Sequence, residues 1–126
     1  MPPLVQGPTE SDILKFDLDK NYTREVVTLL AGTNYAIGSV LGQITASGKF
    51  QLSPDTGSDG SQVAAAVLID AVNATAGDKA GVVIKRGPAI VAQGELVYAG
   101  TVNDDTKRAA KRAQLVTLGI VPRVNA

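Results

Sequence analysis

Cysteine and histidine are both absent from the sequence. Without cysteine the chain has no disulfides and no thiolate metal site, and without histidine it lacks the commonest general base and the commonest transition-metal ligand. Every Ser-His or Cys-His catalytic arrangement is therefore excluded. Tryptophan is also absent, and only 3 Tyr and 2 Phe are present. The core must be built mainly from small aliphatic side chains, which suits a compact β-rich domain or one that relies on contacts between subunits.

A charge imbalance and long hydrophobic runs are missing as well. The 12 basic and 12 acidic residues give a net charge of zero, so no strong field attracts nucleic acid or an anionic membrane. The longest aliphatic run, residues 63–69, is far shorter than the roughly 18 residues that span a bilayer. The N-terminal segment contains neither the basic nor the apolar region of a secretory signal, so we expect a soluble cytosolic protein.

The length of 126 residues is that of one domain. Residues 1–12 contain three prolines and no periodic apolar pattern, which predicts an unstructured segment because nothing in it can be buried regularly. We therefore expect a flexible N-terminal arm over residues 1–22, followed by a single compact domain over residues 23–126.

The end of the predicted arm has the pattern of a β-strand. Leu14, Phe16 and Leu18 alternate with charged residues, so their side chains share one face of an extended chain. A strand of this kind at the end of a loose arm can add itself to the edge of a sheet in another protein. The alternative is that Phe16 and Leu18 cover the core of the domain itself.

Short β-type segments separated by turn residues make up most of the domain. They are residues 26–30, 39–45, 49–52, 63–69, 81–87, 89–98 and 119–124. Many short strands with turns about every ten residues predict a barrel-like or sandwich-like domain that is mainly β, with one or two short helices. Pro122 has no backbone N–H, so we expect the last strand at a sheet edge or in an irregular segment.

One helix is predicted, over residues 103–119. Acidic residues begin this segment, alanines and bases fill its middle, and a glycine ends it. Ala109, Ala113 and Val116 form a narrow apolar stripe of the amphipathic type. The bases are Lys107, Arg108, Lys111 and Arg112. Four bases could bind phosphate, but two aspartates at the start of the helix balance them in part, and we interpret them as a solvated face.

A tetrapeptide of aspartic proteases, Asp-Thr-Gly-Ser, occurs at residues 55–58. In those enzymes apolar strands flank the carboxylate, whereas polar residues flank it here. A calcium loop that starts at Asp55 would have Ala66 at its twelfth position in place of the bidentate Glu. We interpret residues 53–62 as a β-turn loop and predict no catalytic residue and no metal site there.

Lys79 lies in a Gly-Asp-Lys-Ala-Gly segment that is similar to the turn on which lipoyl domains carry their cofactor. In those domains the corresponding glycine precedes the lysine by about one strand, whereas Gly38 precedes Lys79 by 79 − 38 = 41 residues. A lipoyl-type or biotinyl-type carrier, monomeric and modified at Lys79, stays open as the alternative function.

The order of the segments points elsewhere. A glycine-turned strand over residues 31–45 is followed by an Asp-Gly-rich turn, by the small-residue strand at 63–69 and by a hairpin over 81–98. An Asp-Asp-Thr-Lys-Arg helix then comes just before the last strand. From about Val26 onward this order resembles the lambda-like bacteriophage head decoration proteins.

The resemblance implies a non-enzymatic capsid protein with a compact β-tulip or barrel-like domain. Members of that family form trimers at the local three-fold axes of the expanded phage head, where they cement neighbouring major-capsid subunits. It also implies synthesis in the host cytoplasm, a final location on the outer surface of the virion, and no cofactor, nucleic acid or membrane as a partner.

Two sets of residues are predicted to make the protein contacts of such an assembly. The capsid-binding residues of the arm are Leu14, Phe16, Leu18 and Tyr22. The residues of the trimer contact are Ile90, Val97, Tyr98, Ile120 and Val121.

Overall fold

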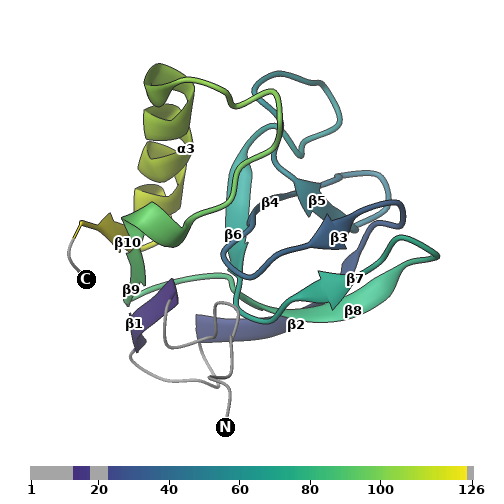
Figure 1. Ribbon diagram of the computed structural model, residues 1–126, viewed down its shortest axis with the longest axis horizontal. Helices are drawn as coiled ribbons and strands as arrows, with labels where there is room; N and C mark the ends of the chain where they lie inside the picture. Colours follow the sequence, from purple (N-terminus) through teal and green to yellow (C-terminus); the bar gives the residue numbers. More distant parts are fainter. Residues whose placement is uncertain (1–12, 18–22, 125–126) are drawn as a thin grey trace, which may run out of the picture.

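The computed structural model describes residues 13–17 and 23–124. These residues form a mainly β architecture with one α-helix (Figure 1). The strands are β1 (Leu14–Asp17), β2 (Arg24–Leu29), β3 (Asn34–Tyr35), β4 (Val40–Gln43), β5 (Phe50–Leu52), β6 (Ala64–Leu68), β7 (Val72–Asn73), β8 (Lys79–Ile84), β9 (Ala89–Ala92) and β10 (Ile120–Arg123). The helical elements are the short 3-10 helix η1 (Gln93–Glu95) and α3 (Asp105–Thr117). The prediction of a mainly β chain with a barrel is confirmed.

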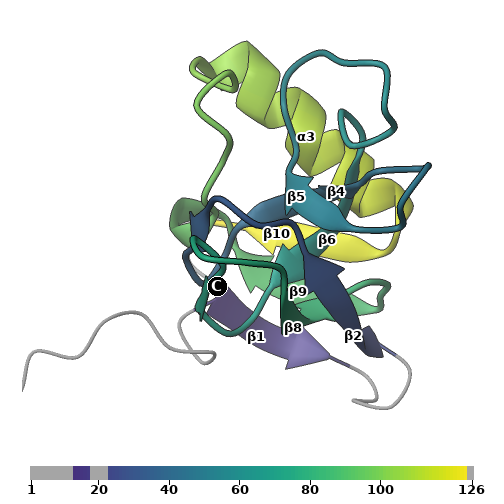
Figure 2. The same ribbon diagram turned by 90° about the vertical axis from the view of Figure 1, so that its right-hand side faces the viewer.

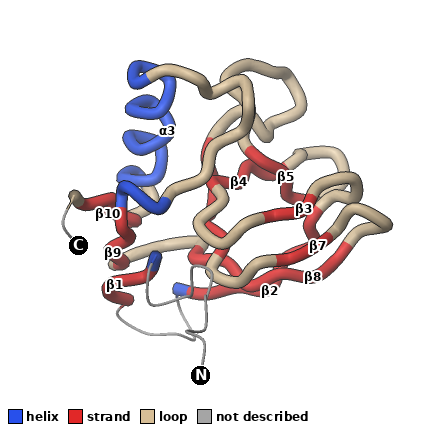
Figure 3. Tube along the Cα trace, in the orientation of Figure 1, coloured by secondary structure: helices blue, strands red, loops and turns tan. Residues whose placement is uncertain are grey.

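Five strands close into a barrel in the order β2-β5-β4-β6-β8. The barrel closes through an antiparallel pairing of β8 with β2, which runs from Arg24 opposite Ile84 to Leu29 opposite Lys79. Of the remaining neighbours, β2 and β5 are parallel and the others are antiparallel. The two-stranded β3–β7 sheet lies beside the barrel (Figure 3). Closure removes free sheet edges from this part of the fold.

A second sheet, in the order β1-β9-β10, lies outside the barrel. In it β9 is antiparallel to β1 and parallel to β10. The prediction of a hairpin over residues 81–98 is wrong, because β8 belongs to the barrel and β9 to this second sheet. The chain between β8 and β9 lies against the end of α3, where Gly87 N donates a hydrogen bond to Leu118 O at 2.8 Å. A side chain at Gly87 would place its Cβ 1.8 Å from Gly119 O, so only glycine permits this approach.

The last strand, β10, lies at an edge of this second sheet, as Pro122 predicts. Ala89 N donates a hydrogen bond to Gly119 O at 3.1 Å. Along a strand, alternate residues turn their backbone groups to the same neighbour, so residues 119 and 121 face β9 and Pro122 faces outward. The missing N–H of Pro122 therefore costs no hydrogen bond within the sheet.

Hydrophobic side chains pack in two clusters on opposite faces of the barrel strands. In β6, Ala66 belongs to one cluster together with Leu68, whereas Val67 belongs to the other, as the period of two in a strand requires. The first cluster takes a side chain from every barrel strand and includes Phe50. The second lies between the barrel, the β1-β9-β10 sheet and α3, which contributes Leu115.

The helix α3 (Asp105–Thr117) lies within the predicted range of residues 103–119 and is two residues shorter at each end. The Asp104 carboxylate accepts a hydrogen bond from Lys107 N at 2.8 Å, which caps the first turn. Gly119 follows the last turn with φ +82°, the left-handed conformation that favours glycine after a helix. Its orientation differs from the expected one, because the apolar stripe points outward. Ala109, Ala113 and Val116 are exposed, and Val116 is 51% exposed.

The buried side of α3 contains a lysine, Lys111, which is only 2% exposed. Its ammonium donates to Ser53 Oγ at 3.0 Å, to Pro54 O at 2.6 Å and to Gln62 O, so its three donors all have acceptors. Burial lowers the pKa of Lys111, and the nearby Asp55 carboxylate opposes that shift. The interpretation of the four helix bases as a solvated face is therefore wrong for Lys111, which ties α3 to the loop at residues 53–62.

The loop that contains the Asp-Thr-Gly-Ser tetrapeptide is held by its own hydrogen bonds. The Asp59 carboxylate accepts from Ser61 Oγ at 2.6 Å and from Ser61 N at 3.0 Å. These bonds lower the pKa of Asp59. Such side-chain to backbone contacts two residues apart are typical of turns, so the interpretation of the segment as a turn is confirmed.

Candidate functional site

The described part of the predicted arm forms a strand of the domain's own second sheet. Leu14 lies opposite Val91 and Phe16 opposite Ile90 in the β1–β9 pairing. Ile13 is 1% exposed and belongs to the core. Ile13 and, in part, Leu14 thus cover the domain's own core, whereas the alternative that Phe16 and Leu18 do so stays a prediction. Leu18 and Tyr22 of the predicted capsid-binding set lie outside the described residues.

The strand β1 is the second edge of the three-stranded sheet. Figure 2 shows α3 on the β10 side of this sheet and β1 on the opposite side. An edge strand presents backbone N–H and C=O groups that can pair with a strand from another chain. The outer edge of β10 is less suited to such pairing, because Pro122 removes a donor there. The β1 edge is therefore better suited than the β10 edge to pair with a strand of a partner protein.

The predicted trimer-contact residues fall into three places. Ile90 and Val121 are direct neighbours in the β9–β10 pairing and are partly exposed, so they share one face of the second sheet. Val97 and Tyr98 lie after η1 and are also partly exposed. Ile120 is 0% exposed and packs in the core cluster with Leu115. Its side chain has no surface left for contact with a neighbouring copy.

In the part of the chain that the structure describes, the geometry supports neither a metal site nor a lipoyl-type turn at Lys79. Within residues 13–17 and 23–124, no three His, Cys, Asp or Glu side chains are grouped so that they could hold a metal ion. Lys79 is the first residue of β8 and lies opposite Leu29 in the barrel, instead of at the tip of a turn. Over the same described residues, no helix is long and apolar enough to cross a membrane.

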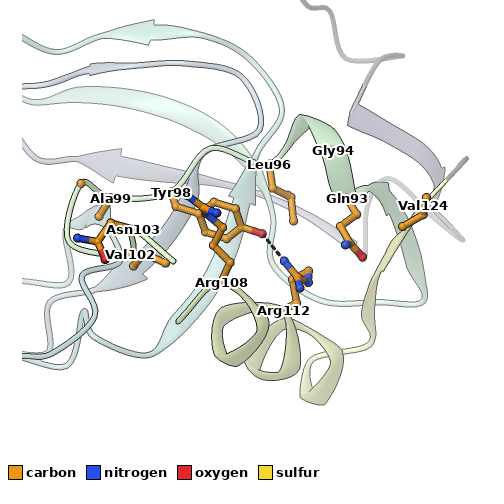
Figure 4. Close-up of a pocket in the computed structure, with 11 residues that line it drawn as sticks. Gln93, Gly94, Leu96, Tyr98, Ala99, Val102, Asn103, Arg108, Arg112 and Val124 are labelled. Atoms are coloured by element: carbon orange, nitrogen blue, oxygen red, sulfur yellow. Dashed lines mark hydrogen bonds between the residues drawn. The ribbon is translucent and has the colours of Figure 1, made fainter. Parts of the chain in front are cut away.

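An open groove of about 820 Å³ lies between α3 and the segment that follows β9 (Figure 4). Its lining residues are Gln93, Gly94, Leu96, Tyr98, Ala99, Gly100, Val102, Asn103, Arg108, Arg112 and Val124. Buried Leu96 and Val102 give it an apolar base, whereas Arg108 and Arg112 give it a basic wall. Val124, which is 68% exposed, lies at one end.

The basic wall of the groove was not recognised in the sequence, where Arg108 and Arg112 were interpreted as solvated bases. The sequence does contain a signal for it. Residues four apart in a helix lie on the same side, so these two arginines share one side of α3. Lys111 is their neighbour on that side, and its burial turns the basic side of the helix toward the molecule.

Beyond its first residue, the exposed Asp105, the outer side of α3 carries no charge. Its exposed residues are Thr106, Ala109, Ala110, Ala113, Val116 and Thr117. Solvent-facing sides of helices are usually rich in charged residues. An uncharged, small-residue surface lets another protein approach closely, without desolvating charges.

These features define a small β-barrel protein that exposes a sheet edge, an open groove and a small-residue helix side. A model of the family described as bacteriophage lambda head decoration protein D matches residues 3–120. The chain therefore belongs to this family of structural phage capsid proteins, as the resemblance in its sequence predicts. A search of curated proteins found no match. The family gives the protein a role in decorating a phage head and a location on the virion capsid.

Proposed function

We propose that the protein binds as a homotrimer at the local three-fold sites of the expanded phage head and stabilises the shell from its outer surface. The observation that carries this proposal is the family match, which extends over residues 3–120 and so over nearly the whole chain. The surfaces described above agree with a role that consists of binding other proteins.

The N-terminal arm makes the main attachment in this proposal, by adding a strand to the major capsid protein. Two observations support it. The match to the family begins at residue 3, within the segment that precedes β1. The strand β1 also lies at a sheet edge, where backbone groups can pair with a strand from another chain.

Three arms on one trimer would act together. After the first arm binds, the other two face their sites at a local concentration of about millimolar, so that weak strand pairings combine into tight attachment. The trimer places its three arms around the same axis that relates the capsid subunits, and each arm then meets an equivalent site.

Contact between copies needs an exposed surface that is not strongly charged. Ile90 and Val121 remain candidates because they lie side by side on the second sheet. We add the outer side of α3, centred on Ala113, because it is exposed and uncharged. Burial of such a surface against a second copy removes apolar atoms from water at little cost in desolvated charge.

Deletion of residues 1–12 tests the role of the arm. The deletion stops at residue 12 because Ile13 is buried in the core and β1 pairs with β9. We expect a folded trimer that binds at least about a hundredfold more weakly to expanded heads lacking their decoration protein. Co-sedimentation measures the binding, and circular dichroism and light scattering check the fold and the trimer.

A second variant separates the sequence of the arm from its length. Residues 2–12 are replaced by Gly and Ser, which keeps the number of residues but removes the apolar side chains. We expect this variant to bind as weakly as the deletion. Head binding equal to that of the unaltered protein, in either variant, would contradict the proposal.

The alternative function as a carrier predicts a different oligomeric state and a different mass. A lipoyl-type or biotinyl-type domain would be a monomer with added mass on Lys79. The capsid proposal predicts an unmodified trimer whose head binding survives the substitution Lys79→Gln. Intact mass and light scattering together distinguish the two.

A further inference from the structure

The groove beside α3 combines an apolar base with positive charge (Figure 4). Leu96 is 8% exposed and Val102 is 3% exposed, so they offer a base that is already packed in the domain. Arg108 and Arg112 project from successive turns of α3 along one wall. None of the residues that line the groove is acidic.

The guanidinium groups of Arg108 and Arg112 each make only a weak interaction within the domain. Arg112 donates a hydrogen bond to the Tyr98 hydroxyl, at the long distance of 3.4 Å. Arg108 lies 3.1 Å from the Asp105 carboxylate, but that side chain is 100% exposed, and a solvated ion pair of this kind is readily exchanged. Arginine binds carboxylates through two parallel hydrogen bonds. The wall is therefore suited to a ligand that carries carboxylates.

The position of the groove connects it with the arm. One end is lined by Gln93, which directly follows β9, the strand paired with β1. Val124, which directly follows β10, also lines it. The groove is thus continuous with the sheet to which β1 belongs.

The geometry points to a second contact with the capsid: the groove receives an extended acidic segment of the major capsid protein, with a carboxylate on Arg112 and apolar side chains against the partly exposed Tyr98 and Ala99. This inference rests on the proposed function. The segment is held by its side chains, because Pro122 removes a backbone donor from the neighbouring edge of β10. The contact is charge-dependent, which distinguishes it from strand pairing by the arm.

The substitution Arg112→Gln in the full-length protein tests this contact. We measure co-sedimentation with expanded heads that lack their decoration protein, across a series of salt concentrations. We expect binding about tenfold weaker at low salt, together with a smaller loss of binding as salt increases, because one charge pair is gone. Arg112→Lys keeps the charge without the paired hydrogen bonds and should lie between the two. Arg108→Gln, on the same wall, should weaken binding in the same direction.

Lys79→Gln is the matched control, since it removes one exposed positive charge from the barrel, away from the groove. It should bind heads as the unaltered protein does. If the unaltered protein binds and both arginine variants bind equally well, the groove inference fails while the proposed function stands. If the arginine variants lose the trimer in light scattering, the groove contacts another copy and the inference fails as well. Failure of the unaltered protein to bind heads at all would overturn the proposed function itself.

Discussion

Replacement of Lys111 by Met tests whether a buried ammonium holds α3 on the barrel. Methionine keeps the aliphatic length of the side chain but has no donor, so Ser53 Oγ and two backbone carbonyls lose a partner at a site that is 2% exposed. Each loss costs about 1 kcal/mol, and relief from burying the ammonium offsets a part of the total. We expect the free energy of unfolding to fall by about 2 kcal/mol, and Tm by about 8 °C for a domain of this size.

The assay is urea unfolding followed by circular dichroism at one fixed protein concentration, since association between copies contributes to stability. Lys107→Met, on the same helix, is the control. The Lys107 side chain is 34% exposed and its Nζ lies 3.9 Å from the Asp55 carboxylate, so we expect a change below about 0.5 kcal/mol. If Lys111→Met costs no more than the control, the three hydrogen bonds do not hold the helix and the reasoning is refuted.

Three further predictions concern the acid range, the barrel and the surface of α3. A hydrogen bond from Lys49 at 2.6 Å lowers the pKa of Asp78 below 3.8, so the stability from this carboxylate is present above the unfolded value and is lost as pH falls through the folded one. Between about pH 5 and about pH 2, Tm should therefore fall more for the unaltered protein than for Asp78→Asn, and equal slopes would contradict this. Gly42→Ala should lower the free energy of unfolding in urea by about 3 kcal/mol, because its Cβ would lie 1.9 Å from Ser61 O; an unchanged value would show that the loop moves away freely. Ala113→Arg should change the free energy of unfolding of the isolated chain by less than about 0.5 kcal/mol, because the site is exposed. The same substitution should convert the trimer to monomer in light scattering. A persistent trimer would exclude the outer side of α3 from the trimer contact.

Local sequence signals located most of the elements. Runs of β-branched and small apolar residues marked the barrel strands, and capping by Asp104 and Gly119 fixed the ends of α3. These signals act over a few residues and are visible in the sequence. Which strands pair is decided over longer distances. The approach of Gly87 to the end of α3 separates β8 from β9, and no local pattern indicates that contact.

The orientation of α3 shows a second limit of sequence patterns. Counted by hydrophobicity, Ala109, Ala113 and Val116 should face inward and Lys111 outward. Alanine and valine are small, so exposing them costs little, whereas Leu115 gains more from burial. Burial of Lys111 is acceptable only because the loop at residues 53–62 brings it three acceptors. Those acceptors lie about fifty residues away in the sequence, so the pattern of residues within the helix does not reveal them.

The central claim is that the protein strengthens a phage shell, and the stability of the shell itself tests it most directly. The temperature at which expanded heads lacking their decoration protein come apart is measured with and without saturating amounts of the protein, with the deletion of residues 1–12 as the control. The unaltered protein should raise this temperature, and the deletion variant should leave it unchanged. If the protein saturates the heads and the temperature does not rise, it binds the shell without stabilising it, and the central claim is contradicted.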